Sequence, residues 1–83
     1  MKPVTYSKEA IRTLTRMPRN EATRIRDKIE AYAADPAAQA GNLKRLQGRD
    51  ELRLRVGDWR VILRETTVVA VLRIAPRGSA YRP

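Results

Sequence analysis

The chain has 83 residues, with 18 lysines and arginines, 9 aspartates and glutamates, no histidine and no cysteine, and its net charge is +9 at pH 7. This composition excludes a disulfide-linked fold, a zinc site of the usual thiolate and imidazole ligands, and imidazole acid–base chemistry. The length predicts one small domain over residues 1–83, with no room for a cofactor-sized cavity beside its own core. The positive charge favours a polyanionic partner, most simply a nucleic acid, or an acidic protein.

The sequence shows no membrane or export signal. No stretch has the roughly 18 consecutive apolar residues of a membrane span, and the N-terminus lacks the apolar core of a signal peptide. We therefore expect a cytoplasmic protein that does not contact a membrane. Charge is uneven along the chain, because residues 43–83 contain ten of the 18 cations but only four of the nine acidic residues.

The first half of the sequence predicts a short strand and a helical hairpin. Val4 and Tyr6 alternate with other residue types, as in a strand. Ser7 is a predicted N-cap for a helix that ends before Pro18. The apolar stripe of this helix consists of Ala10, Ile11, Leu14 and Met17. A second helix begins at Pro18 and ends at Asp35-Pro36. Its apolar face consists of Ala22, Ile25, Ile29, Tyr32 and Ala33.

The second half of the sequence predicts strands. A connection over residues 36–42 leads to a brief strand over residues 43–46. Apolar residues alternate with arginines on both sides of Gly57-Asp58, which predicts a β-hairpin over residues 52–64 with a two-residue turn. Residues 68–74 form an almost continuous apolar run, as in an interior strand. The predicted fold class is α+β, with an N-terminal strand and a helical hairpin packed on one face of a small antiparallel sheet.

The two-residue turn fixes which residues of the hairpin share a face. Six apolar residues fall on one face, which we expect to form the core: Leu52, Leu54, Val56, Trp59, Val61 and Leu63. On the opposite face Arg55 opposes Arg60, and Arg53 opposes Ile62. The outer face of the hairpin is therefore strongly cationic.

The next strand adds to both faces. If Thr66-Thr67 is a second tight turn, Arg73 lies beside Arg60, and the residues that join the core face are Ala70, Leu72 and Ile74. The outer face then collects Arg53, Arg55, Arg60 and Arg73. Like charges opposed across strands cost about 0.2–1 kcal/mol each, so folding alone gives no reason to gather them, whereas a bound polyanion does. The alternative is a solvated face on which long arginine stems cover apolar residues.

The C-terminal segment contains Arg77, Gly78 and Tyr81. It can place a cation and an aromatic ring at the edge of the basic face, which suits a phosphate and an unstacked base. The alternative is a frayed terminus.

Three segments, and the order of the predicted elements, resemble the RelE/ParE toxin superfamily. These segments are residues 43–46, residues 52–62 with the Gly-Asp-Trp-Arg turn, and residues 74–82. The spacing from Arg77 to Tyr81 resembles the RelE-like branch. The match covers essentially the whole chain, so the resemblance implies a single RelE-like toxin domain over residues 1–83, acting as the toxin of a bacterial type II toxin–antitoxin pair.

The RelE-like branch implies a ribosome-dependent endoribonuclease, or mRNA interferase, that inhibits translation. In this branch the 2′-hydroxyl of the mRNA attacks the adjacent phosphate, with no metal and no cofactor. The resemblance implies that Arg60 holds the scissile phosphate, Arg77 stabilises developing charge, and Tyr81 stacks on or orients the target base. Arg53 stands at the position of a proposed base. The predicted RNA-binding residues are Lys44, Arg55 and Arg73.

The sequence departs from the best-known members at positions that move protons. Glu51 and Arg53 stand where those members have lysines, and Pro76 stands where many relatives have histidine. A guanidinium is a poor proton acceptor near neutrality. Tyrosine and lysine lose their protons only near pH 10, so Tyr81 and Lys44 are slow candidates unless the ribosome supplies other groups.

Two other functions fit the sequence. A ParE-like toxin would inhibit DNA gyrase by protein contact and would need no catalytic residues. A non-enzymatic RNA-binding module would bind RNA with steep salt dependence and would not cut it. Either toxin branch implies a cognate antitoxin, and the charge predicts that its binding segment is acidic and amphipathic.

Overall fold

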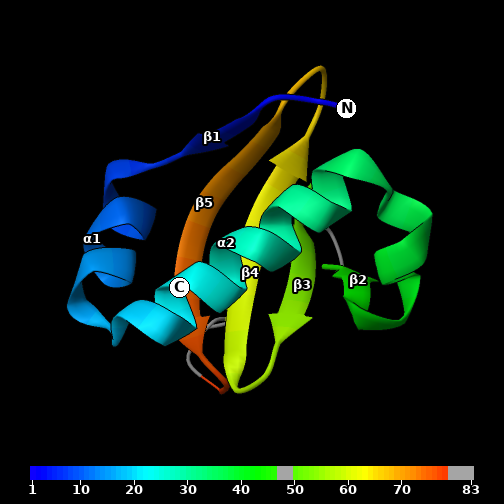
Figure 1. The fold of residues 1–83 in the computed structure, drawn as a ribbon. Coiled ribbons are helices and arrows are strands. Elements are labelled where there is room, and N and C mark those ends of the chain that lie inside the picture. The colour runs from blue at the N-terminus through cyan, green and yellow to red at the C-terminus, as the bar shows by residue number, and fades with distance from the viewer. Residues whose placement is uncertain (47–49, 79–83) are drawn as a thin grey trace.

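The computed structural model describes residues 1–46 and 50–78, which form a five-stranded mixed sheet with two α-helices on one face (Figure 1). In chain order the elements are β1 (Val4–Tyr6), α1 (Lys8–Arg16), α2 (Arg19–Ala34), the 3₁₀-helix η1 (Pro36–Asn42), β2 (Leu43–Arg45), β3 (Leu52–Val56), β4 (Trp59–Glu65) and β5 (Val69–Pro76). The strand order is β1-β5-β4-β3-β2, in which β1 runs parallel to β5 and the other neighbours are antiparallel.

The predicted α+β class, with a helical hairpin packed on one face of a small sheet, is confirmed. The N-terminal strand β1 does not pack on that face but is an edge strand of the sheet. The parallel β1 makes that sheet mixed rather than wholly antiparallel. Among the described residues, no helix combines the length and the apolar character that crossing a membrane requires.

α1 begins at the predicted cap. Ser7 Oγ accepts a hydrogen bond from the Ala10 N–H at 3.0 Å, and the Ser7 hydroxyl donates to the Leu72 carbonyl at 2.7 Å. The cap therefore completes the first turn and also ties α1 to β5. Ala10 and Leu14 are buried, but Ile11 is 47% exposed, so its predicted place in the apolar stripe is wrong. Ile11 lies about 100° around the helix from Ala10 and turns away from the sheet.

α2 crosses the sheet diagonally and supplies most of the helical part of the core (Figure 1). Its predicted apolar face is buried at Ile25, Ile29, Tyr32 and Ala33. The helix ends at Ala34, as Asp35-Pro36 predicts. The connection that follows is a 3₁₀-helix over Pro36–Asn42, because the fixed φ of a proline suits the first position of a tight helical turn.

The β3–β4 hairpin has the predicted register. Val56 pairs with Trp59, and the pairing continues as far as Leu52 with Leu63. All six of the alternating apolar residues lie in the core or pack against it. The two-residue turn begins with Gly57 at φ +58°, a backbone conformation that residues with a side chain rarely adopt.

β5 differs from the prediction at its start. Glu65 pairs with Val69, so three residues rather than two connect β4 to β5. Val69 and Val71 are therefore fully buried in the core, in the places predicted for Ala70 and Leu72. The observed register buries β-branched side chains, which fill a sheet core better than alanine does.

A bulge in β5 corrects the alternation in the second half of the strand. The register shifts after Ile62, and Leu72 is the extra residue. Ile74 therefore lies on the core face and Arg73 on the outer face, as predicted. The predicted neighbour of Arg73 is wrong, however, because Arg73 pairs with Ile62 and not with Arg60.

A buried tyrosine connects α2 to the end of β4. The Tyr32 hydroxyl donates a hydrogen bond to the Glu65 carboxylate, and Lys2 Nζ donates to Glu65 Oε2 at 2.8 Å. These hydrogen bonds, that of Lys2 first and that of Tyr32 second, hold the pKa of Glu65 below its ordinary value. Burial, and then the bond to Glu65, raises the pKa of Tyr32.

Replacing Tyr32 by phenylalanine is expected to lower the free energy of unfolding at pH 7 by about 1–3 kcal/mol, because the partly buried Glu65 carboxylate loses a donor. The pKa of Glu65 is lower in the folded state than in the unfolded state. The ionised carboxylate therefore stabilises the fold above the unfolded pKa, and this stabilisation is lost as the pH falls through the folded pKa. The decrease in the free energy of unfolding caused by Tyr32→Phe should therefore be smaller below pH 4. Urea unfolding followed by Trp59 fluorescence measures both values, with Tyr6→Phe as the control. An equal loss at pH 7 and pH 3 would contradict this account.

Candidate nucleic-acid interface

The outer face of the sheet, opposite the helices, carries cations in neighbouring rows. In the row next to the hairpin turn, Arg55 on β3 pairs with Arg60 on β4. The next row runs from β2 to β5 in the order Lys44, Arg53, Ile62 and Arg73. The sheet therefore brings the predicted residues of β2, β3 and β4 onto one surface.

Arg60 is the most constrained of these side chains. It is 8% exposed, and its Nη1 donates hydrogen bonds to the carbonyls of Gly57 at 3.0 Å and Trp59 at 2.9 Å. Burial lowers the pKa of the Arg60 guanidinium, and three neighbouring guanidinium charges lower it further. In order of effect, these charges belong to Arg53, Arg77 and Arg55. Because an arginine stays protonated at neutral pH even so, four positive charges converge here.

Arg77 directly follows β5, and a backbone hydrogen bond holds it next to this cluster. Its N–H donates to the Asp58 carbonyl at 2.7 Å, which joins the end of β5 to the hairpin turn. The Asp58 carboxylate partly offsets the positive charge around Arg60. The cluster therefore sits where the β3–β4 turn and the end of β5 meet.

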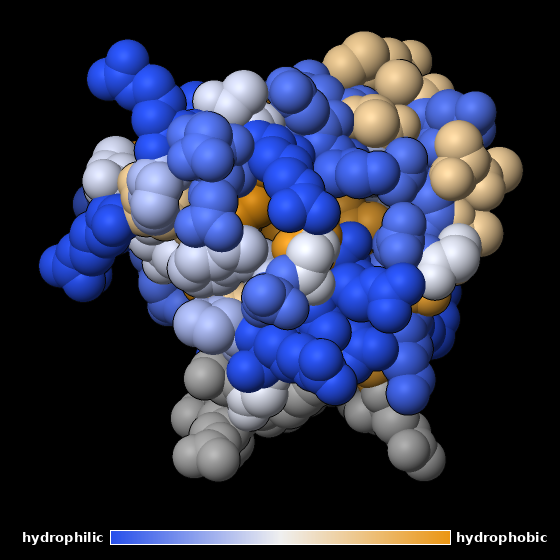
Figure 2. Space-filling model, turned by 60° about the horizontal axis from the view of Figure 1, so that its bottom comes forward, coloured by the Kyte–Doolittle hydropathy of each residue, from blue (hydrophilic) through white to orange (hydrophobic). Residues whose placement is uncertain are grey.

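Two adjoining hollows open at the edge of this face, where residues of η1 and, in the larger hollow, of α2 join the strands in lining them. The larger, which we call the cationic pocket, has a volume of about 470 Å³ and is lined by Arg24, Lys28, Asn42, Arg55, Val56, Gly57, Asp58, Arg60 and Arg77. The smaller, of about 240 Å³, is lined by Gly41, Asn42, Leu43, Lys44, Arg53 and Arg55. Arg55 and Asn42 belong to both, and the Arg55 guanidinium donates to Asn42 Oδ1 at 3.2 Å. Figure 2 shows the molecule from its turn end, where strongly hydrophilic side chains cover much of the surface and smaller apolar areas lie between them.

The structure brings most, but not all, of the predicted site residues together. Arg53, Arg55, Arg60 and Arg77 lie together, and Lys44 lies in the smaller hollow. Arg73 is on the same face, but it pairs with Ile62 one row away from Arg60 and lines neither hollow. Tyr81 lies outside the described residues.

Sequence reasoning missed the contribution of α2. Arg24 and Lys28 line the cationic pocket, and an ideal Cβ placed on Gly57 would lie 3.0 Å from Arg24 Nη1. The available signal was the spacing of four between two cations on the polar face of this helix, which places them one turn apart. Their proximity to the hairpin turn depends on how α2 crosses the sheet, which that spacing does not determine.

Replacing Gly57 by alanine is expected to lower the free energy of unfolding by about 1–2 kcal/mol, because φ is +58° here and the left-handed region is costly for a residue with a side chain. The new Cβ would also displace the Arg24 guanidinium. Gly41→Ala is the matched control, since a Cβ there meets nothing within 4 Å. Urea unfolding compares the two variants, and equal stability of both would contradict the assigned turn.

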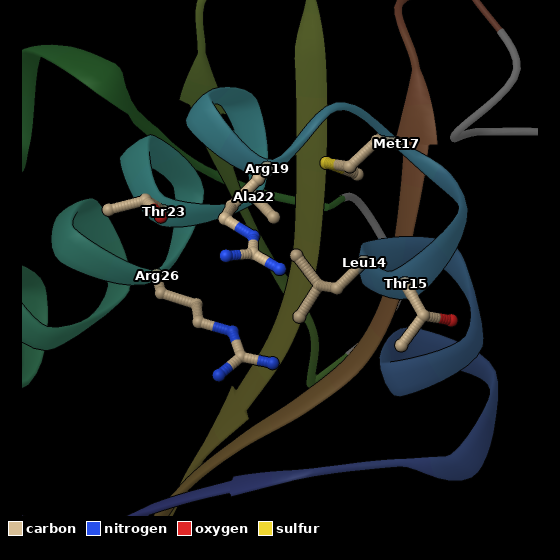
Figure 3. Close-up of a pocket in the computed structure, with 7 residues that line it drawn as sticks. All are labelled: Leu14, Thr15, Met17, Arg19, Ala22, Thr23 and Arg26. Atoms are coloured by element: carbon tan, nitrogen blue, oxygen red, sulfur yellow. The ribbon is translucent and has the colours of Figure 1, made fainter.

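A separate pocket of about 510 Å³ lies between the two α-helices and is lined by Leu14, Thr15, Met17, Arg19, Ala22, Thr23 and Arg26. Figure 3 shows the side chains of Arg19 and Arg26 on α2 extending into the space that faces Leu14 on α1. The Arg26 guanidinium also lies 5.8 Å from the centre of the Tyr6 ring. This inter-helix pocket therefore combines apolar walls with two cations.

Comparison with known proteins gives a family and a fold. The family model described as the ParE toxin of the type II toxin–antitoxin system parDE matches residues 4–81. A search of curated proteins finds no match to the sequence.

Several solved structures are similar over nearly their whole length. The RelE–RelB complex of Pyrococcus horikoshii OT3 has a chain with 25% identity and a TM-score of 0.79, covering 93% of this chain and 96% of that one. The RelB–RelE complex of Methanococcus jannaschii gives 21% identity, a TM-score of 0.72 and coverages of 93% and 94%. The intact RelBE complex of E. coli gives 17% identity, a TM-score of 0.73 and coverages of 92% and 96%. The last two likenesses show the fold alone.

Proposed function

We propose that this chain, which belongs to the ParE toxin family of type II toxin–antitoxin systems within the RelE/ParE superfamily, stops translation by cutting mRNA in the ribosomal A site. The proposed activity is that of a ribosome-dependent endoribonuclease, or mRNA interferase, carried by one toxin domain over residues 1–83. Because translating ribosomes are in the cytoplasm, the proposed activity is cytoplasmic. The observation that supports it most is the convergence of four guanidinium groups around the buried Arg60.

In the proposed reaction the 2′-oxygen of one nucleotide attacks the adjacent phosphorus, and the bond from phosphorus to the 5′-oxygen of the next nucleotide breaks. The products are a 2′,3′-cyclic phosphate and a 5′-hydroxyl. The 2′-hydroxyl proton passes to a base or to water, and the leaving 5′-oxygen gains a proton. The phosphorane between them carries more negative charge than the diester, so fixed guanidinium groups favour it over the ground state.

Within this proposal each predicted site residue has a role. Arg60, held against the turn carbonyls, binds the scissile phosphate, and Arg77 stabilises the charge that develops on the phosphorane or the leaving oxygen. Arg53 neutralises the same charge, and Tyr81 stacks on the target base. The residues that bind flanking RNA are Lys44, Arg55 and Arg73. Such a site acts through fixed charge and uses few groups that move protons, which suits a chain without histidine.

Cleavage mapping tests this proposal. Purified protein is incubated with ribosomes programmed with a defined mRNA, and the cut positions are located by primer extension. We expect cuts within the A-site codon and none in the same mRNA without ribosomes. The absence of cutting, under conditions in which a RelE toxin assayed in parallel cuts, would reject the nuclease.

The matching ParE model favours a second candidate, inhibition of DNA gyrase through protein contact. Such a function does not need the proposed catalytic residues. The triple variant Arg60→Ala, Arg77→Ala and Tyr81→Ala separates the two candidates in a supercoiling assay. Gyrase inhibition by the wild type that survives the triple change would favour this second candidate, whereas the nuclease predicts no gyrase inhibition by either protein.

We also propose that an antitoxin with an acidic, amphipathic segment neutralises this chain. The similar structures named above are toxin–antitoxin complexes, and the inter-helix pocket offers apolar walls beside Arg19 and Arg26. A partner present at 100 times its Kd should raise the free energy of unfolding by about 2.7 kcal/mol. Thermal unfolding with and without the product of a short neighbouring reading frame measures this, and an unchanged Tm would count against that partner.

A further inference from the structure

We propose that Arg24 and Lys28 of α2 form, with Arg55 and Asn42, a subsite for a second backbone phosphate of the RNA. This phosphate would neighbour the one that Arg60 binds. The inference rests on the proposed function, because it assigns another part of the same substrate to the same surface. It adds α2 to a site whose other described residues lie on the sheet or, in the case of Arg77, directly after β5.

The position of the two side chains supports this subsite. Arg24 and Lys28 line the same cationic pocket as Arg55, Arg60 and Arg77. The nearness of Arg24 Nη1 to the α-carbon of Gly57 places its guanidinium over the hairpin turn. Two residues on the polar face of α2 therefore border the pocket at the turn end of the sheet.

Charge in this pocket is strongly unbalanced. Five cations line about 470 Å³, and the one carboxylate among the lining residues is that of Asp58. Like charges in one hollow oppose folding, and a bound anion removes that repulsion. Guanidinium groups bind phosphate through two parallel hydrogen bonds, which makes an arginine-lined hollow well suited to phosphate oxygens.

The shape of the surface favours an RNA backbone over a compact anion. Arg55 and Asn42 border both hollows, so cations follow one another from Lys44 and Arg53, past Arg55, to Arg24 and Lys28. A single strand presents a phosphate at every nucleotide, and proteins bind such strands along a continuous basic groove. The α2 subsite extends this groove beyond the scissile phosphate.

Binding of an uncleavable RNA tests the subsite. Fluorescence anisotropy measures the affinity of the full chain for a 2′-O-methyl hexanucleotide at several salt concentrations. The double variant Arg24→Gln and Lys28→Gln is compared with Lys8→Gln and Arg12→Gln, an exposed pair on α1 with the same spacing and the same loss of charge. We expect the α2 pair to bind about tenfold more weakly and to reduce the slope of log K against log salt by about 0.7, since one phosphate contact is lost and each contact in a single strand contributes about 0.7. The α1 pair should change the affinity less than about twofold, because salt screens the interaction between distant exposed charges and the RNA.

Several results would overturn the subsite. They are an equal loss in both double variants, no loss in the α2 pair, no RNA binding by the wild type, or a loss confined to binding of an acidic peptide. Circular dichroism checks that each variant is folded. Cleavage on ribosomes reports separately on the proposed function: a wild type that binds RNA through the α2 pair but never cuts would reject the nuclease alone, and one that cuts while the α2 pair binds normally would reject the subsite alone.

Discussion

Replacing Arg60 by glutamine is expected to lower the rate of mRNA cleavage on the ribosome about 10²–10³-fold, the usual loss when one fixed donor to a developing oxyanion is removed. Arg60 is almost fully buried and bonds to two turn carbonyls, so its guanidinium is already in place before the phosphate arrives. Glutamine retains an amide that can bond to those carbonyls but lacks the charge. Single-turnover cleavage of a pre-bound mRNA measures the effect.

Arg64→Gln is the control for this variant. Arg64 lies on the same strand, but its side chain is 49% exposed and pairs with Glu51 at 3.5 Å. Surface ion pairs contribute little, so we expect cleavage within about twofold of the wild type. Arg60→Lys keeps the charge and loses the planar fork, and it should fall between the two. A cleavage rate in Arg60→Gln within threefold of the wild type would show that Arg60 does not bind the scissile phosphate.

The cleavage rate is expected to rise about tenfold per pH unit between pH 6.5 and 8.5, without a plateau near neutrality. The chain has no histidine, and a guanidinium does not release its proton in this range. The concentration of hydroxide, of tyrosinate or of neutral lysine would each rise about tenfold per pH unit in this interval, so the logarithm of the rate would have a slope of about one against pH.

Single-turnover rates across this interval, corrected for mRNA hydrolysis without toxin, measure the slope. A bell-shaped profile or a plateau near pH 7 would contradict the expectation. It would mean that a group with a pKa near neutrality, such as one supplied by the ribosome or the mRNA, moves the proton.

The sequence predicted the β3–β4 hairpin correctly because two independent constraints agree there. Strict alternation assigns each residue to a face, and Gly57 at the first turn position permits the positive φ that a two-residue connection needs. The cluster of Arg53, Arg55 and Arg60 follows directly from this register. Its extension by Arg77 depends on the hydrogen bond from its backbone N–H to Asp58, which gives no pattern in the sequence.

The β5 register could not be predicted in the same way. Residues 68–74 are apolar at all positions but one, so two registers one residue apart both bury apolar side chains. Long-range contacts accompany the observed choice: β1 pairs with β5, and Ser7 bonds to the carbonyl of Leu72 at the bulge. The position of Arg73 depends on that choice, which is why its predicted neighbour was wrong.

Local sequence patterns could not predict that α2 contributes to the site, for a similar reason. A helix pattern gives the buried face but not the crossing angle over a sheet. Arg24 and Lys28 are ordinary polar-face residues until α2 brings them to the hairpin turn. The site that we propose is therefore partly a property of tertiary packing.

The chemistry of the cut ends tests the central claim most directly. mRNA cut on ribosomes by the purified protein should carry a 2′,3′-cyclic phosphate on the upstream fragment and a 5′-hydroxyl on the downstream fragment, because the proposed nucleophile is the adjacent 2′-oxygen. Mass spectrometry of the upstream fragment and phosphorylation of the downstream fragment by polynucleotide kinase identify both ends. Intact mRNA, or fragments ending in a 3′-hydroxyl and a 5′-phosphate, would contradict the account.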